Sequence, residues 1–180
     1  MIIGKKTIHY QTVDSTNDEA RRLIKQGEGE GLVVIAESQT AGRGKPGATW
    51  VSPPGNLYLS AVVNPHRSQK DLAPLTLTAA LAVRAAIARI SGLPVTIKWP
   101  NDILIRGKKA GGILTERLVA GSIIIGIGIN INCRIGLPSA DNNSATSLSA
   151  ETGQTYPIGE LTALLLEELN NEYLAYLSKF

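Results

Sequence analysis

Residues 122–130 constrain the fold more than any other part of the sequence. This nine-residue segment alternates isoleucine with glycine and carries no charged side chain. A short apolar run of this kind is typical of a buried strand. Glycines inside a strand also allow a ligand or another backbone to approach closely. The segment therefore predicts a sheet with a buried strand and room against it at Gly126 and Gly128.

Other periodic segments predict the elements around this strand. Apolar or alternating runs predict further strands at residues 32–36, 57–63, 95–99, 103–106 and 110–117, the last two joined by a turn at 107–108. Helical patterns predict helices at residues 16–27, 71–92 and 159–177. Thr16 followed by Glu19 fits a capping box at the first helix, and glycines at 27 and 92 fit helix ends. Runs of sequential strands between helices favour an α+β fold with helices packed on a mixed sheet.

Length, charge and cysteine content limit the class of protein. A chain of 180 residues suggests one domain. The net charge is only +3 and no run of Lys or Arg exceeds two residues, so we expect no nucleic-acid partner. The single cysteine, Cys133, is interpreted as a buried or incidental thiol. No uninterrupted apolar stretch approaches a membrane span and no apolar leader precedes the first helix, so we expect a cytoplasmic protein without a membrane partner.

Residues 42–47 form a glycine-rich segment with two cations, Arg43 and Lys45. Glycines let backbone N–H groups approach an anion, and the cations add charge. The spacing of a P-loop is absent. The segment therefore indicates an anion-binding loop, although a flexible basic surface loop explains its composition equally well.

Residues 98–102 join a cation, an aromatic ring, a proline turn and two polar side chains at the end of a strand. Lys98 can hold a phosphate, and the carboxylate of Asp102 can help hold Mg²⁺ with its water shell. The alternative is a Pro-Asn-Asp turn with an incidental lysine.

Three further motifs each have a plain structural alternative. Lys109 can be a ligand-binding cation or a solvated strand end. Gly126 and Gly128 can admit a ligand or serve tight sheet packing. Residues 15–17 can bind a ligand or simply cap a helix. His9 and His66 lack motif context, and no Ser/His/Asp arrangement or metal-ligand spacing is found.

In combination and in order, these motifs resemble the biotin–protein ligase family. The matching residues are Ser15-Thr16-Asn17, Gln39-Thr40-Ala41-Gly42-Arg43-Gly44, Trp50, Lys98-Trp99-Pro100-Asn101-Asp102, Lys109, Gly112-Ile113-Leu114 and Gly126-Ile127-Gly128-Ile129-Asn130. The resemblance covers about residues 14–132 and continues more weakly through 145–148 and the last helix. It implies a class II synthetase-like α+β domain with a mixed, largely antiparallel sheet.

The resemblance also implies an activity and site residues. The family makes biotinyl-5′-AMP from biotin and ATP with Mg²⁺, then passes biotin to a lysine of a carboxyl carrier protein, and its members are often homodimers. The implied catalytic residues are Arg43, Lys45, Lys98 and Lys109. The implied biotin-binding residues are Ser15, Thr16, Asn17, Gln39, Arg43, Gly44, Lys45, Lys109, Gly112 and Gly128. The implied ATP-binding residues are Arg43, Lys45, Trp50, Lys98, Asn101, Asp102 and Asn130, with Asp102 also at the metal.

The sequence departs from the family pattern in its loop and in its extent. The family often has arginine where this chain has Lys45 and Ala48, and Pro46 stiffens the middle of the loop. We expect residues 1–180 to form a single catalytic domain, without an N-terminal winged helix or a C-terminal small β-barrel. Two other functions stay open, a non-catalytic module that binds biotin or its adenylate, and a related lipoate or octanoate ligase. Lys98, Asp102 and Lys109 argue against the first, and the loop and the 98–102 motif argue against the second.

Overall fold

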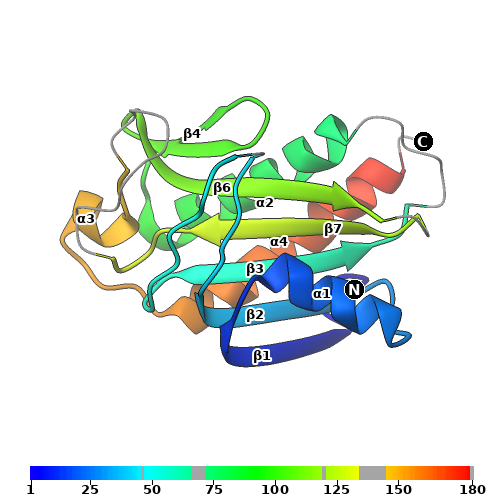
Figure 1. The fold of residues 1–180 in the computed structure, drawn as a ribbon. Helices are drawn as coiled ribbons and strands as arrows, with labels where there is room; N and C mark the ends of the chain where they lie inside the picture. The colour runs from blue at the N-terminus through cyan, green and yellow to red at the C-terminus, as the bar shows by residue number, and fades with distance from the viewer. Residues whose placement is uncertain (46, 66–71, 119–120, 134–144, 179–180) are drawn as a thin grey trace.

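The computed structural model describes residues 1–45, 47–65, 72–118, 121–133 and 145–178. These residues form one sheet in the order β1-β2-β3-β7-β6-β5-β4 (Figure 1). The strands are β1 (Lys6–Val13), β2 (Leu32–Gln39), β3 (Leu57–Val63), β4 (Val95–Lys98), β5 (Asp102–Ile105), β6 (Lys108–Arg117) and β7 (Ile123–Ile129). Only the β1–β2 pair among them is parallel, which confirms the mixed, largely antiparallel sheet.

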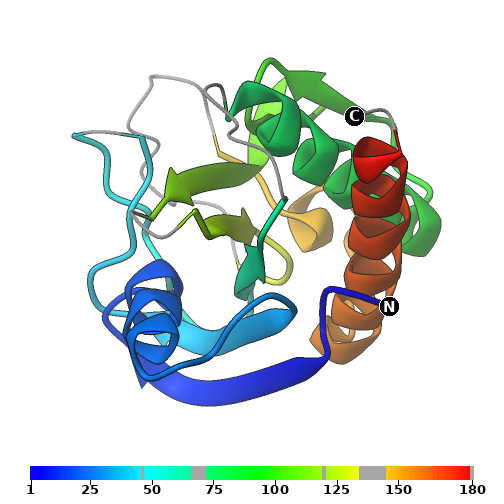
Figure 2. The ribbon, with the colours of Figure 1, turned by 90° about the vertical axis from the view of Figure 1, so that its right-hand side faces the viewer.

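Helices cover the two faces of the sheet unequally. The helices are α1 (Thr16–Lys25), α2 (Ala73–Ser91), α3 (Leu148–Thr152) and α4 (Ile158–Leu177). The two long helices, α2 and α4, pack side by side on one face, and α1 lies on the other (Figure 2). In Figure 1, α1 and the described part of the segment that joins β2 to β3 stand over the opposite face.

The core follows the alternation of side chains along the strands. On β3, Leu57 and Leu59 point into the large apolar cluster beneath α2 and α4, whereas Val62 joins a small cluster beneath α1. By length and apolar composition, α2 is comparable to a membrane-spanning helix. Its buried side chains belong to the large cluster, so packing on the sheet accounts for that composition. Burial of each such aliphatic side chain contributes about 1.5–3 kcal/mol.

Most predicted elements are confirmed, and two were missed. β1 is a half-exposed edge strand whose mixed polar composition hides its alternation. α3 is a single short turn of helix, below the length at which helical periodicity is visible. The predicted 159–177 helix and the strand at 122–130 correspond to α4 and β7 within one residue.

Two predicted boundary details are wrong. The N-cap of α1 is Ser15, not Thr16, and no side-chain cap bond forms there. Thr16 instead donates its backbone N–H to Oε1 of Gln39, 2.8 Å away. The β5–β6 turn lies at Arg106 and Gly107, where φ is 49° and 77°, because Lys108 already pairs with Ile105. Asp71, the predicted cap of the second helix, lies outside the described residues.

Candidate active site

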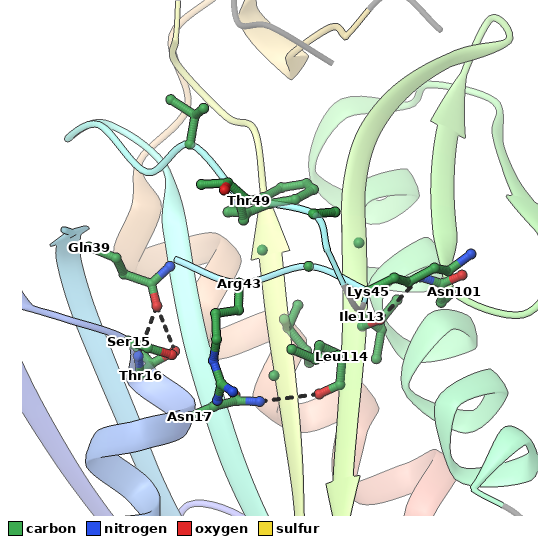
Figure 3. Close-up of a pocket in the computed structure, with 18 of the residues that line it drawn as sticks. Ser15, Thr16, Asn17, Gln39, Arg43, Lys45, Thr49, Asn101, Ile113 and Leu114 are labelled. Atoms are coloured by element: carbon green, nitrogen blue, oxygen red, sulfur yellow. Dashed lines mark hydrogen bonds between the residues drawn. The ribbon is translucent and has the colours of Figure 1, made fainter. Parts of the chain in front are cut away.

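A cavity lies on the α1 face of the sheet, between the N-terminus of α1 and the β2–β3 loop (Figure 3). All but two of the predicted site residues line it. They are Ser15, Thr16, Asn17, Gln39, Arg43, Gly44, Lys45, Trp50, Asn101, Lys109, Gly112, Gly128 and Asn130. The two exceptions, Lys98 and Asp102, do not line the cavity. Distant motifs thus meet in one place, as the resemblance implies.

Several lining residues were not predicted as site residues. They are Ala48, Thr49, Val51, Ile113, Leu114, Gly126, Ile127 and Ala145. Gly126 was predicted only as a position that a ligand can approach, although it lies on the same face of β7 as Gly128, which was predicted to bind biotin. Ala145 had no such signal, since its backbone reaches the cavity only by bridging to Lys109.

One end of the cavity is a polar wall at the start of α1. Oε1 of Gln39 accepts from both the N–H and the hydroxyl of Thr16, at 2.8 and 3.2 Å. Nε2 of Gln39 donates to Ser52 Oγ at 2.8 Å. Ser60 Oγ lies 2.8 Å from Thr16 Oγ1 and 2.6 Å from Asn17 Oδ1. Hydrogen bonds among these side chains fix their positions. The wall is therefore preorganised to form hydrogen bonds with a polar group of a ligand.

The floor consists of glycines against which two side chains lie. A Cβ at Gly128 would be 2.7 Å from Cε2 of Trp50, and a Cβ at Gly112 would be 3.2 Å from Cζ3 of the same ring. A Cβ at Gly126 would be 2.3 Å from Oδ1 of Asn17. The close approach predicted at these glycines is therefore made by two side chains of the protein, the indole of Trp50 and the amide of Asn17. The indole Nε1 is buried without a hydrogen-bond partner, which leaves a donor for a ligand.

Lys109 is the cation at the centre of the site. Its Nζ lies 2.9 Å from Oδ1 of Asp102 and 5.6 Å from the centroid of the Trp50 ring. Asp102 is 4% exposed, so the ammonium group pairs with a buried carboxylate. Such a pair fixes the position of the lysine at the cavity wall.

The predicted metal role of Asp102 stays a prediction, and the structure gives its carboxylate a partner within the protein. No cluster of three His, Cys, Asp or Glu side chains suited to a metal ion occurs among the described residues. The carboxylate is paired with Lys109 and does not line the cavity. Lys98 is exposed at the end of β4. The pairing favours Asp102 as the group that holds Lys109.

The far wall is built by the chain around Asn130. Its Nδ2 donates to the carbonyl of Thr146 at 3.0 Å, and the N–H of Thr146 donates to the carbonyl of Lys109 at 2.9 Å. Asn101 donates through Nδ2 to the carbonyl of Ile113, 3.3 Å away. Its Oδ1 is buried without a partner, so an acceptor is available to a ligand there.

The β2–β3 loop closes over the cavity. Within it, Gly44 N–H donates to Ala48 and Trp50 N–H donates to Gly42, both at 2.9 Å. Arg43 reaches out of the loop, with its guanidinium beside Asn17 in Figure 3. Lys45 lines the cavity, and Pro46 lies outside the described residues.

The mixed seven-stranded sheet with helices on its faces is that of a class II synthetase-like domain, and the cavity lies on the face that carries α1. A sequence model of the biotin/lipoate A/B protein ligase family matches residues 9–132. The chain belongs to this family, and within it to the biotin protein ligases.

Individual relatives agree with that assignment. The bifunctional ligase/repressor BirA of Bacillus subtilis is 40% identical over 159 residues, which cover 85% of this chain and 49% of BirA. The biotin protein ligase of Aquifex aeolicus in complex with biotin and ATP is 35% identical, with a TM-score of 0.83 over 98% of this chain and 72% of that one. The Leishmania major ligase with biotinyl-5-AMP is 32% identical, with a TM-score of 0.78 over 92% of this chain and 73% of that one. The chain thus spans about half the length of the curated relative.

Proposed function

We propose that this chain is an ATP-dependent biotin–protein ligase domain. It activates biotin as biotinyl-5′-AMP and transfers the biotinyl group to a lysine of a biotin carboxyl carrier protein. The observation that carries the proposal is the cavity itself, which joins the Thr16–Gln39 polar wall to a fixed cation, Lys109. The Aquifex ligase in complex with biotin and ATP and the Leishmania ligase in complex with biotinyl-5-AMP support the same substrates here.

Biotin fits the cavity from its polar wall toward Lys109. Ser15, Thr16 and Gln39 bind the ureido end by hydrogen bonds. Ile127 and Leu114 pack against the apolar rings. Trp50 and Asn130 flank the nucleotide, for which the unpaired indole donor and the Asn101 acceptor are available.

The first step brings two anions together. A carboxylate oxygen of biotin attacks the α-phosphorus of ATP, the P–O bond to the β-phosphate breaks, and pyrophosphate leaves. Lys109 and Lys45 reduce the repulsion and stabilise the charge that builds up at the α-phosphate. Most of the catalysis is then positioning of the two substrates.

The second step transfers the biotinyl group. The neutral ε-amine of the carrier lysine attacks the acyl carbon, the bond to the AMP oxygen breaks, and the amide loses a proton to solvent. The β2–β3 loop covers the adenylate between the steps and protects it from water. Magnesium would enter with the phosphates of ATP and reduce their charge, since Mg²⁺ is commonly bound by substrate phosphates together with one or two carboxylates. A cytoplasmic location, with access to the carrier protein, is part of the proposal, as is a homodimer.

A transfer assay tests this function. The purified protein is incubated with biotin, ATP and Mg²⁺, with and without a carboxyl carrier domain, and products are identified by mass spectrometry. Biotinyl-AMP with a biotinylated carrier supports the full activity. Biotin binding without either product supports the non-catalytic module instead, and competition by lipoate at equal concentration supports the related lipoate ligase.

A further inference from the structure

Arg43 connects the β2–β3 loop to two separate elements of the sheet layer. Its Nη2 lies 2.9 Å from Oδ1 of Asp18 on α1 and 3.0 Å from Oε2 of Glu116 on β6. The hydrogen bonds of Gly44 and Trp50 described above stay within the loop. Arg43 therefore ties the loop to both sides of the cavity.

The two carboxylates are part of a balanced cluster. Arg21 pairs with Asp18 and lies 3.4 Å from Glu116. Oε2 of Glu116 also accepts from Nδ2 of Asn17 at 2.7 Å. Two arginines thus face two carboxylates, and the side chain of Glu116 is only 21% exposed. The charge of Arg43 is therefore compensated by protein carboxylates.

The contacts of Arg43 indicate a different role for it than for the other cations of the cavity. Arg43 is held by Asp18 and Glu116. The other described cations that line the cavity are Lys45 and Lys109. Arg43 itself then acts on the position of the loop. Because its partners sit on α1 and β6, loss of either one releases the loop on that side.

We propose that Asp18 and Glu116 are positioning residues that hold the β2–β3 loop closed through Arg43 and so set how long the adenylate stays bound. This rests on the proposed function for its ligand, whereas the contacts of Arg43 involve protein side chains alone. Each ion pair is partly exposed, so each contributes modestly and is weakened by salt. We expect removal of one partner to speed loss of the adenylate roughly 3- to 10-fold.

The variants are Glu116→Gln, Asp18→Asn and Arg43→Ala, alone and in pairs. Glutamine keeps an acceptor for Asn17 while it removes the charge. The matched control is Glu168→Gln. Glu168 and Glu167 hold Arg89 between α2 and α4, so this arginine is also paired with two carboxylates but lies away from the cavity. Two quantities are measured, hydrogen exchange of residues 40–52 without ligand and the release rate of preformed biotinyl-AMP.

The proposal expects faster exchange in the loop and faster release for Glu116→Gln and Asp18→Asn, with no change for Glu168→Gln. Glu116→Gln should add nothing once Arg43 is alanine, and the difference from the unmutated protein should shrink at high salt. Unchanged exchange and release in both variants, or equal effects in the control, would overturn it. If the unmutated protein forms no adenylate but exchange responds as expected, the proposed function fails while the loop closure stands.

Discussion

The ammonium group of Lys109 lies 2.9 Å from Oδ1 of Asp102, a carboxylate that is 4% exposed. Asp102 begins β5 and pairs across the sheet with Gly112, so the backbone fixes the carboxylate. Lys109 lies on the neighbouring strand, β6, and reaches the cavity wall from there. The buried carboxylate of Asp102 therefore fixes the position of the Lys109 ammonium group at the cavity wall.

Replacement of Asp102 should slow the activation step more than it weakens biotin binding. Asp102→Asn leaves Lys109 without its counter-charge, so the ammonium group moves from the place where the α-phosphate charge builds up. We expect adenylate formation to fall about 10- to 100-fold, measured as biotin-dependent pyrophosphate release at saturating substrates. Lys108→Met, at the neighbouring exposed lysine, is the control, and a normal rate in Asp102→Asn would contradict this role.

The glycines under Trp50 cannot be replaced without moving the indole. A Cβ at Gly128 would lie 2.7 Å from both Cε2 and Nε1 of that ring. Gly128→Ala should therefore weaken nucleotide and biotin binding by about tenfold or more, since the ring loses its place on the sheet. Calorimetric titration measures the affinities.

A helical glycine provides the matched control for this substitution. Gly159 in α4 has nothing within 4 Å of the position of an added Cβ. Gly159→Ala, in the first turn of α4, should raise the stability slightly and leave binding unchanged. Equal binding in Gly128→Ala and Gly159→Ala would show that the indole position is unimportant.

Glu151 accepts a hydrogen bond from Thr146, which is part of the far wall of the site, and it should make the stability of the fold depend on pH. A hydrogen bond from Thr146 and, less strongly, one from Lys108 lower the pKa of this carboxyl below its usual value. A lowered folded-state pKa means that the ionised form stabilises the fold above about pH 4.3, and that this contribution is lost as pH falls through the folded value.

Glu151→Gln should therefore cost about 1–2 kcal/mol at pH 7, and its deficit should shrink as the pH falls through the lowered folded-state pKa of Glu151. Urea unfolding at several pH values measures this difference. A deficit that is constant with pH would mean that the charge of Glu151 does not contribute.

The loop should retain the adenylate more firmly with arginine at position 45. Lys45 is a point charge, whereas a guanidinium offers a planar fork to a phosphate. Lys45→Arg should slow the loss of biotinyl-AMP about 3- to 10-fold. A filter-binding chase measures the rate. Equal or slower loss from the unmutated protein would contradict the expectation.

Much of the site could be predicted because its residues lie in motifs with unusual composition. The glycine-rich segment at 42–47 and the turn at 98–102 both lead to residues that line the cavity, namely Arg43 and Asn101. The pairing of Asp102 with Lys109 could not be predicted, since it depends on strand register and on the irregularity between Ile103 and Leu104. For the same reason the sequence did not indicate that Glu116 meets Arg43.

In the fold as well, elements with a clear local pattern were predicted, and features without one were missed. β7 and α4 were predicted because their periodicity is uninterrupted. β1 was missed because an edge strand need not alternate strongly when solvent covers part of both faces. The cap of α1 was misplaced because Thr16 hydrogen-bonds Gln39, which lies 23 positions away in the sequence.

The most direct test of the account is formation of biotinyl-AMP by the purified protein and by Lys109→Met. Each is incubated with biotin, ATP and Mg²⁺ without a carrier protein, and adenylate and pyrophosphate are quantified by mass spectrometry and a coupled assay. We expect equal amounts of the two products from the unmutated protein, and a rate at least about 100-fold lower from Lys109→Met, with biotin still bound. Absence of adenylate from the unmutated protein, or an unchanged rate in Lys109→Met, would contradict it.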